Sequence, residues 1–118
     1  MTTTYAVLFP GNEKTWAEAS AEERARVYGL HGRFAELLAE RGHRVTGGAE
    51  LADSSGAKVV RGTLDNVSVT DGPFAETVEQ LTGFYLVESD DLQDLLNICG
   101  VVSEGDPVEV RACLAPDH

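Results

Sequence analysis

The sequence predicts an α+β protein in which helices cover one face of an antiparallel sheet. Segments with the alternating pattern of strands are interspersed with segments that have the period of amphipathic helices. The 118 residues suit one domain, residues 1–118, and leave no room for two. The first strand is expected at residues 4–9, where both alternating sets of side chains are apolar, and the turn residues 10–12 are expected to end it.

A long helical pattern follows over residues 16–41. Ser20 is expected to cap a helix start, because a glutamate stands three residues further on, as in a capping box. Gly29 and Gly32 weaken the centre of the helix by roughly 1 kcal/mol each relative to alanine, so we expect two helical pieces with a break or bend there. Gly42 is expected to end the helix.

The second strand is predicted at residues 43–51 and contains a Gly-Gly pair at 47–48. Glycines inside a strand indicate a bulge or a close approach of the neighbouring backbone. After a short loop, residues 58–64 and 67–70 are expected to form a hairpin that turns across residues 65–66.

The C-terminal part begins with a tight turn at residues 71–73, where proline forces a change of direction. Residues 81–88 are the strongest strand pattern, and Ser89 is expected to cap the helix that follows. The apolar stripe of this helix consists of Leu92, Leu95, Leu96 and Cys99. A last strand is predicted at residues 107–114, with alternate side chains on opposite faces.

When the hairpin is set aside, the order of elements is βαββαβ, the split arrangement of ferredoxin-like domains, with helices on one face of the antiparallel sheet. The other face of the sheet then carries apolar side chains that need a cover. A second copy of the chain is the simplest cover, so we expect a homodimer in which two sheets pair face to face, as in a dimeric α/β-barrel.

The charge balance limits the partners of this protein. Nine basic residues against 20 acidic residues give a net charge of -11. Nucleic-acid phosphates and anionic lipids repel such a chain on average, so we expect no nucleic-acid and no membrane partner. Cys99 and Cys113 lack disulfide or zinc spacing, and residues 1–4 lead into a strand without the pattern of a signal peptide, which favours a cytoplasmic location.

Several motifs resemble the DGPF branch of the YCII-related proteins. The segment DGPFAET at residues 71–77 is followed by EQL at 79–81 and GFYL at 83–86. GAEL at 48–51 and VEVR at 108–111 agree with the same pattern, so the resemblance covers essentially the whole chain. It implies a dimeric ferredoxin-like fold with clefts between the sheet and neighbouring loops.

The resemblance implies less about chemistry. Most DGPF proteins have no assigned reaction. In the wider YCII-related group, a histidine in the first helix and an aspartate are proposed as an acid/base pair, and a protein of similar fold eliminates chloride from a muconate-type product. His31 stands where that helical histidine falls.

The candidate catalytic residues are His31, Glu50 and Asp71. A histidine has an ordinary pKa near ~6.5 and therefore suits general acid/base work at neutral pH; the alternative is a packed histidine at the edge of the core. Glu50 follows the Gly-Gly pair and can project toward the helices, where a carboxylate orients a histidine. Asp71 is the other acid candidate, although an aspartate before Gly-Pro also caps a turn.

The candidate substrate-binding residues are Arg111, Tyr85 and Phe74. Arg111 could hold a substrate carboxylate or pair with Glu109 or Asp71, and the aromatic rings could line a pocket or fill a core. The histidines at 31, 43 and 118 lie in separate elements, so no metal and no cofactor are expected.

Two classes of function remain open on the sequence. One is a cofactor-independent enzyme that isomerises or eliminates on a small organic acid, with His31 as the acid/base. The other is a non-catalytic module that binds a small ligand or a protein. The presence of a titratable helix residue near acidic turns favours the first class, and the absence of any specific catalytic motif favours the second.

Overall fold

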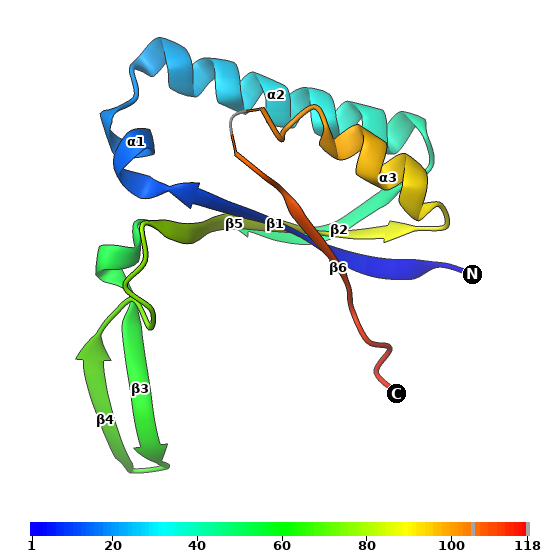
Figure 1. Cartoon of the computed structure of the whole chain (residues 1–118). Helices are drawn as coiled ribbons and strands as arrows, with labels where there is room; N and C mark the ends of the chain where they lie inside the picture. The colour runs from blue at the N-terminus through cyan, green and yellow to red at the C-terminus, as the bar shows by residue number, and fades with distance from the viewer. Residues whose placement is uncertain (105, 118) are drawn as a thin grey trace.

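The computed structural model describes residues 1–104 and 106–117. Four strands form one antiparallel sheet in the order β2-β5-β1-β6, and β3 and β4 form a separate hairpin. Helices lie on one side of the four-stranded sheet (Figure 1). The elements in chain order are β1 (Thr3–Asn12), α1 (Glu13–Glu18), α2 (Ala21–Glu40), β2 (Arg44–Glu50), η1 (Ser54–Gly56), β3 (Lys58–Thr63), β4 (Asn66–Asp71), β5 (Glu79–Ser89), α3 (Leu92–Cys99) and β6 (Glu109–Ala112).

The α+β class and the extra hairpin are therefore as predicted. Without β3 and β4 the order is βαββαβ, and β5 lies between β1 and β2 as the split ferredoxin-like arrangement requires. All neighbouring strands of the sheet are antiparallel. The core lies between the sheet and the helices and consists of Val7, Phe34, Leu38, Val87, Leu95, Ile98 and Cys99.

The helical region divides at a different place from the one predicted. The first strand does not end at the turn residues but continues to Asn12, whose side chain accepts hydrogen bonds from the amides of Lys14 and Thr15 at 3.0 and 3.2 Å. These two bonds start the short helix α1. The oxygen of Ser20 then accepts from the amide of Glu23 at 3.0 Å and caps α2, as expected.

The predicted break at Gly29 and Gly32 is wrong, because α2 runs through both residues. Both glycines are exposed, and nothing lies within 4 Å of where their side chains would begin. Their cost of about 1 kcal/mol each is small beside the burial of Phe34 and Leu38 on the same helix. Gly42, with φ of +82°, ends the helical region as predicted.

The Gly-Gly pair of β2 marks a close approach to β5, as predicted. The register against β5 shifts between Val45 and Gly47, so β2 contains an irregularity there. Gly48 has φ of +142°, and a Cβ atom at this residue would lie 2.4 Å from the carbonyl oxygen of Phe84. Beyond the irregularity Glu50 pairs with Gly83 and shares its face of the sheet.

The predictions for α3 and β6 need correction. Asp91, not Ser89, is the N-cap of α3, because its carboxylate accepts from the amide of Asp94 at 3.1 Å. Leu92 and Leu96 are exposed, while Ile98, absent from the predicted stripe, is buried. The last strand is shorter than residues 107–114 and covers Glu109–Ala112.

The β3–β4 hairpin forms an arm that extends away from the sheet on the side opposite the helices (Figure 1). Its turn lies at residues 64–65, where Asp65 has φ of +62°, one residue earlier than predicted. The radius of gyration is 16.5 Å, whereas a compact chain of this length has about 13.5 Å. The arm accounts for this extended shape.

Candidate functional site

His31 and Tyr85 form the centre of the candidate site. His31 lies on α2, and its Nδ1 is 3.0 Å from the hydroxyl of Tyr85 on β5; the donor depends on the tautomer of the ring. Tyr85 faces the helices because it pairs with the buried residue Val7. Phe9 packs edge-on against both rings, with centroids 5.1 Å from His31 and 5.6 Å from Tyr85.

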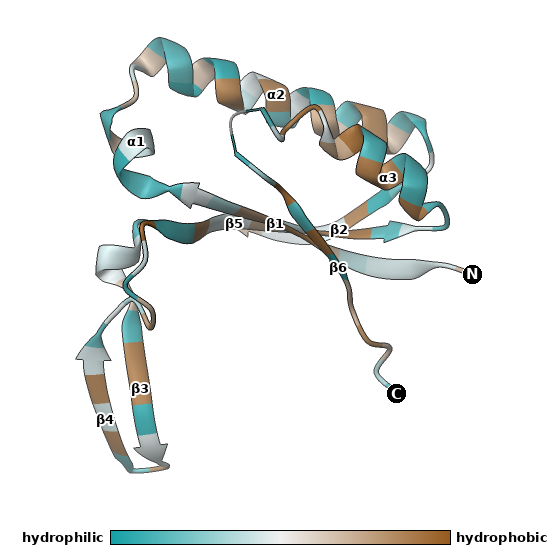
Figure 2. Ribbon diagram, in the orientation of Figure 1, coloured by the Kyte–Doolittle hydropathy of each residue, from teal (hydrophilic) through white to brown (hydrophobic). Residues whose placement is uncertain are grey.

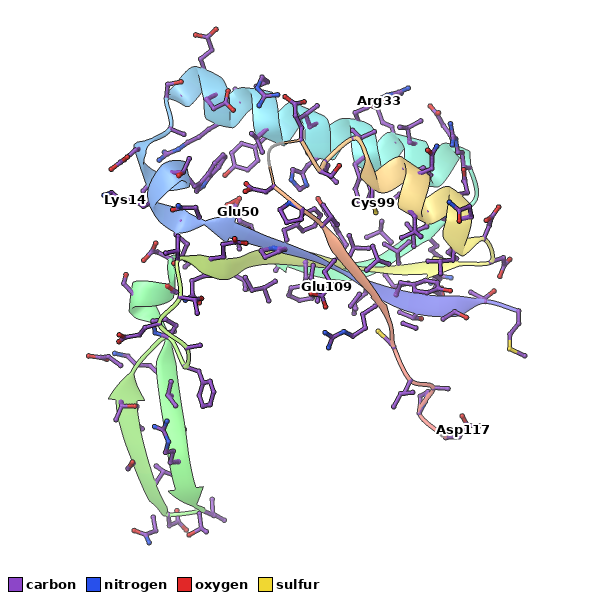
Figure 3. The ribbon with its side chains drawn as sticks, in the orientation of Figure 1. Lys14, Arg33, Glu50, Cys99, Glu109 and Asp117 are labelled. Atoms are coloured by element: carbon purple, nitrogen blue, oxygen red, sulfur yellow. The ribbon has the colours of Figure 1, made fainter. Side chains whose placement is uncertain are left out.

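Glu50 brings a carboxylate to the same side of the sheet, as its place after the Gly-Gly pair predicted. It lies between the sheet and the helices (Figure 3). The hydroxyl of Tyr28 donates to its carboxylate at 2.9 and 3.1 Å from the two oxygens. The ring of Tyr28 packs edge-on against Trp16 of α1, with centroids 5.6 Å apart.

Arg24 joins α1 to α2 beside this cluster. Its guanidinium group donates to the carbonyl oxygens of Trp16 and Ala17 and lies 5.6 Å from the centre of the Trp16 ring. Cation–π contacts of this kind favour one orientation of the indole. The short helix is thereby fixed beside Tyr28 and Glu50.

The electrostatics of the cluster favour a neutral imidazole at His31 and protonated phenols at Tyr28 and Tyr85. Burial lowers the pKa of His31 below its ordinary 6.5, and the negative charge of Glu50 opposes this shift. Burial and then the charge of Glu50 raise the pKa of Tyr85. The hydrogen bond to Glu50 raises the pKa of Tyr28. His31 is therefore available as a base at neutral pH.

The structure brings three of the predicted site residues together and leaves three elsewhere. His31, Glu50 and Tyr85 share the helix side of the sheet. Asp71 lies at the base of the arm, where the amine of Lys58 is 2.5 Å from its carboxylate. Phe74 follows the arm and is 82% exposed.

Arg111 lies on the face of the sheet that the helices do not cover. It pairs with Ala6, whose neighbour Val7 points into the core, so both Ala6 and Arg111 point the other way. Its guanidinium group is 2.7 Å from the carboxylate of Glu109, the pairing weighed as an alternative on the sequence. Within one chain Arg111 and His31 therefore lie on opposite faces of the sheet.

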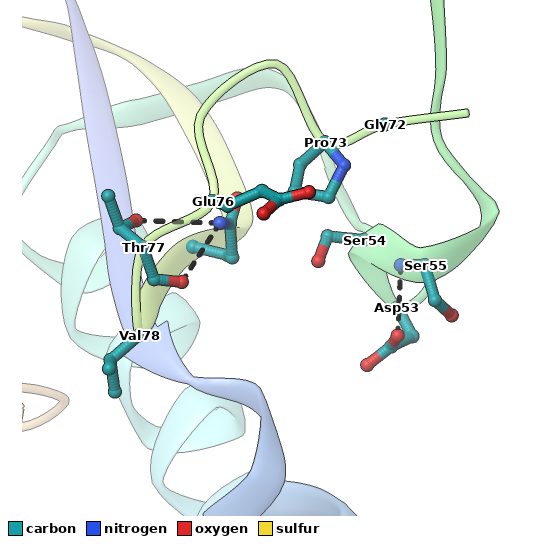
Figure 4. Close-up of a pocket in the computed structure, with 9 residues that line it drawn as sticks. Asp53, Ser54, Ser55, Gly72, Pro73, Glu76, Thr77 and Val78 are labelled. Atoms are coloured by element: carbon teal, nitrogen blue, oxygen red, sulfur yellow. Dashed lines mark hydrogen bonds between the residues drawn. The ribbon is translucent and has the colours of Figure 1, made fainter. Parts of the chain in front are cut away.

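A separate cavity of about 440 Å³ lies where the arm joins the body (Figure 4). It is open to solvent, and its lining includes Gly72 and Pro73 of the DGPF motif. Around them stand the carboxylates of Asp53 and Glu76 and the hydroxyl of Thr77. None of the residues that line this cavity belongs to the His31 cluster, so the motif and the titratable cluster form two distinct places on the molecule.

Sequence reasoning missed a buried hydrogen-bond chain at the other end of the sheet. His43, which is 6% exposed, has Nδ1 2.8 Å from the hydroxyl of Ser89 and Nε2 2.8 Å from the carboxylate of Asp94. Ser89 also accepts from the amide of Asp91 and is buried, so its oxygen is not accessible to a substrate. This chain of hydrogen bonds connects α3 to the sheet. The periodicity of the sequence carries no sign of it.

The described residues contain no group of three or more histidine, cysteine or acidic side chains arranged to hold a metal ion. His118, considered with the other histidines on the sequence, lies outside the described part of the chain. No helix within residues 1–104 and 106–117 is long and apolar enough to cross a membrane.

The fold and the cluster define a small ferredoxin-like α+β protein in which a histidine and a tyrosine of the long helix meet a tyrosine and a glutamate of the sheet. A family model described as "YCII-related domain" matches residues 3–108. The chain belongs to this family. It is also similar to an uncharacterized protein of Rhizobium meliloti (strain 1021), with 34% identity over 108 residues, which cover 87% of this chain and 82% of that protein. The resemblance to the YCII-related proteins found in the sequence is thereby confirmed.

Proposed function

We propose that this protein is a cofactor-independent enzyme of the DGPF branch that moves a proton on a small organic acid, in an isomerisation or an elimination. The observation that carries the proposal is the contact between His31 and the Tyr85 hydroxyl at 3.0 Å, beside the charge of Glu50. This arrangement combines a base, a phenolic donor and a carboxylate that favours the protonated ring.

In this proposal the neutral ring of His31 carries its proton on Nδ1, which donates to the Tyr85 oxygen, and Nε2 exchanges a proton with the substrate. Its Nδ1 is engaged by Tyr85, and the described residues provide no hydrogen-bond partner for Nε2. Glu50 stabilises the imidazolium that forms when the ring takes a proton, as an adjacent carboxylate does for other catalytic histidines. The substrate then receives the proton back at another atom, or loses a leaving group.

Arg24 replaces Arg111 as the candidate for binding a substrate carboxylate at this site. The charge of Arg24 reaches Tyr28, which donates to Glu50. A planar guanidinium group suits a carboxylate ligand. The proposal gives the predicted acid Asp71 and the predicted substrate-binding residue Phe74 no part in this step. Asp71 is paired with Lys58 at the base of the arm, and Phe74 is exposed.

The homodimer is part of the same proposal. The uncovered face of the sheet has an apolar centre of Ala6, Leu8, Phe84 and Leu86. Two ion pairs, Arg111–Glu109 and Arg44–Glu88, flank it. An apolar centre with a charged rim is typical of protein interfaces, and a second copy offers the same surface by twofold symmetry. A cytoplasmic location agrees with the two free cysteines.

The test is an NMR titration of the His31 ring in the wild-type chain and two variants. Glu50→Gln removes the charge that favours the imidazolium, so the pKa of His31 is expected to fall further. Asp71→Asn is the matched control, because this acid is paired with Lys58 in the arm and is expected to leave the titration unchanged. Small organic acids are then screened by their shifts of the His31 and Tyr85 signals.

A His31 ring that titrates at its ordinary pKa and ignores Glu50→Gln would contradict the proposal. Any acid that binds is next tested for turnover by the wild-type chain and by His31→Gln. Turnover that survives this substitution would remove His31 as the acid/base even if the ligand binds at the site.

One observation favours a second function, a non-catalytic module that binds a small ligand. The cavity of about 440 Å³ at the DGPF motif is lined by acidic and hydroxyl groups and by none of the titratable cluster. Such a lining suits a ligand with several hydrogen-bond donors. Ligand-induced NMR shifts at Thr77 and Gln80, with no shift at His31, would favour this function over the enzyme.

A further inference from the structure

The arm has one apolar face and one polar face. Its register places Val60 opposite Val69 and Gly62 opposite Val67, and the alternation of side chains directs all three valines to one side. Val60 is 59% exposed, Val67 is 55% exposed and Val69 is 56% exposed. Figure 2 shows hydrophobic bands on both strands of the arm.

The side chains on the opposite face of the arm are mostly polar and can form hydrogen bonds with water. It carries Arg61, Ser68 and Thr70, with Nη1 of Arg61 3.4 Å from the Thr70 hydroxyl, and only at the base of the arm a valine, the half-buried Val59. An antiparallel pair with this alternation normally packs its apolar face and leaves the polar face in solvent. The alternation of the arm therefore identifies the valine face as the side that needs a cover.

Within residues 1–104 and 106–117, no side chain provides this cover. Val60, Val67 and Val69 belong to none of the core contacts, and a two-stranded hairpin alone is only marginally stable in water. The base of the arm is held by the Lys58–Asp71 ion pair and by the bond from the Gly72 amide to the Ala57 carbonyl at 2.7 Å. These contacts fix where the arm begins but cover none of its apolar face.

We propose that the arm is an assembly element whose valine face, Val60, Val67 and Val69, packs against a second copy of this chain. The inference rests on the homodimer proposed above and adds the segment that completes its interface. Two copies related by a twofold axis exchange arms, so the same contact forms twice and the valine faces of both copies are buried.

The charge distribution favours a second copy as the occupant. The arm, residues 58–71, holds two cations, Lys58 and Arg61, and two anions, Asp65 and Asp71, so its net charge is zero. The remainder of the chain therefore carries the whole formal charge of -11. The neutral arm approaches another acidic copy without the net repulsion that the body would meet.

The direction and size of the arm agree with this assignment. The arm extends on the side of the uncovered sheet face (Figure 1), so a copy that covers this face also meets the arm. With strands ~4.8 Å apart and ~3.3 Å per residue, the sheet face projects about 400 Å² and the arm adds about 200 Å². This increase by about half brings the contact closer to the roughly 800 Å² that a standard interface buries on each partner.

The experiment compares Val60→Lys with Thr63→Lys on the full chain. Both changes add one positive charge to β3, but Val60 lies on the apolar face and Thr63 on the polar face. The dimer dissociation constant is measured by sedimentation and light scattering over a dilution series. Val60→Lys is expected to raise the dissociation constant about a hundredfold, tenfold for the Val60 of each of the two copies. Thr63→Lys is expected to raise it less than about threefold.

A third variant, Leu8→Lys on the uncovered sheet face, separates this inference from the dimer on which it rests. If Leu8→Lys dissociates the dimer and Val60→Lys has no effect, the proposed sheet-face dimer is supported and the role of the arm is overturned. Equal weakening by Val60→Lys and Thr63→Lys would also overturn it, because the two faces would then be equivalent. A wild-type chain that stays monomeric at all concentrations would overturn both.

Discussion

Gly48→Ala is expected to destabilise the protein by about 3 kcal/mol or more. The backbone at Gly48 has φ of +142°, which side-chain-bearing residues rarely adopt, and holding such a residue there costs on the order of 1–3 kcal/mol. The added Cβ would also lie 2.4 Å from the carbonyl oxygen of Phe84 and 3.0 Å from the Cα of Tyr85. Both of these atoms belong to the backbone of β5. The clash therefore cannot be relieved by the rotation of one side chain, and β2 has to move away from β5.

The matched control is Gly29→Ala, which adds the same methyl group where nothing lies within 4 Å. In the exposed interior of α2 this change is expected to stabilise by about 0.5–1 kcal/mol. Urea unfolding followed by circular dichroism measures both free energies. A Gly48→Ala variant within 0.5 kcal/mol of the wild type would refute the reasoning about this contact.

The same variant has a consequence for the site. Gly48 stands two residues before Glu50, whose carboxylate accepts the Tyr28 hydroxyl. Displacement of β2 is expected to lengthen this bond and to weaken the effect of Glu50 on His31. The His31 titration in Gly48→Ala should therefore shift in the direction of Glu50→Gln.

The further predictions concern the histidines, Asp94 and the two cysteines. His43→Ala is expected to cost about 2–4 kcal/mol in urea unfolding, because it leaves a buried hydroxyl and a carboxylate without their partner. The free energy of unfolding is expected to fall as the pH drops below about 6.5. The reason is that the pKa of His31 is lowered in the folded chain, so the unfolded chain binds the proton more readily. His31→Gln should flatten this part of the plot of unfolding free energy against pH. A second fall is expected at more acid pH, as protonation passes the lowered pKa of Asp94. A thiol reagent should modify exposed Cys113 quickly and Cys99 only on unfolding, because burial raises the pKa of Cys99 to about 11; equal rates would contradict this.

The periodicity of the sequence predicted most of the fold. Alternation identified the strands, and the Ser20 cap and Gly42 gave the limits of the long helix correctly. The Gly-Gly pair predicted the close approach of β2 to β5, and this local feature also placed Glu50 on the helix side. These successes share a cause: each depends on residues close together in the chain.

The errors have physical reasons of the opposite kind. The break at Gly29 was wrong because burial of the opposite helix face outweighs two exposed glycines. The Asn12 cap was missed because Pro10 and Gly11 indicate a turn, although β1 continues through them. Alternation also cannot tell which sheet a strand joins, so the sequence did not predict that the hairpin stands apart from the sheet.

The candidate site was predictable only in its individual residues. His31, Glu50 and Tyr85 were named, but Tyr28 was not, since its contact with Glu50 joins residues 22 positions apart across two elements. Asp71 was named as a partner of His31, but in the structure it is the last residue of β4 and pairs with Lys58. Long-range side-chain pairs leave no local pattern to detect.

The base of the arm also has a consequence for engineering. The amide of Gly72 meets the carbonyl of Ala57, so the chain leaves and re-enters the body at almost the same point. A short linker could therefore replace residues 58–71 with little loop-closure cost, and a foreign peptide could be inserted there without passing through the core. The arm can thereby be exchanged or removed while the strands and helices that enclose the core are kept.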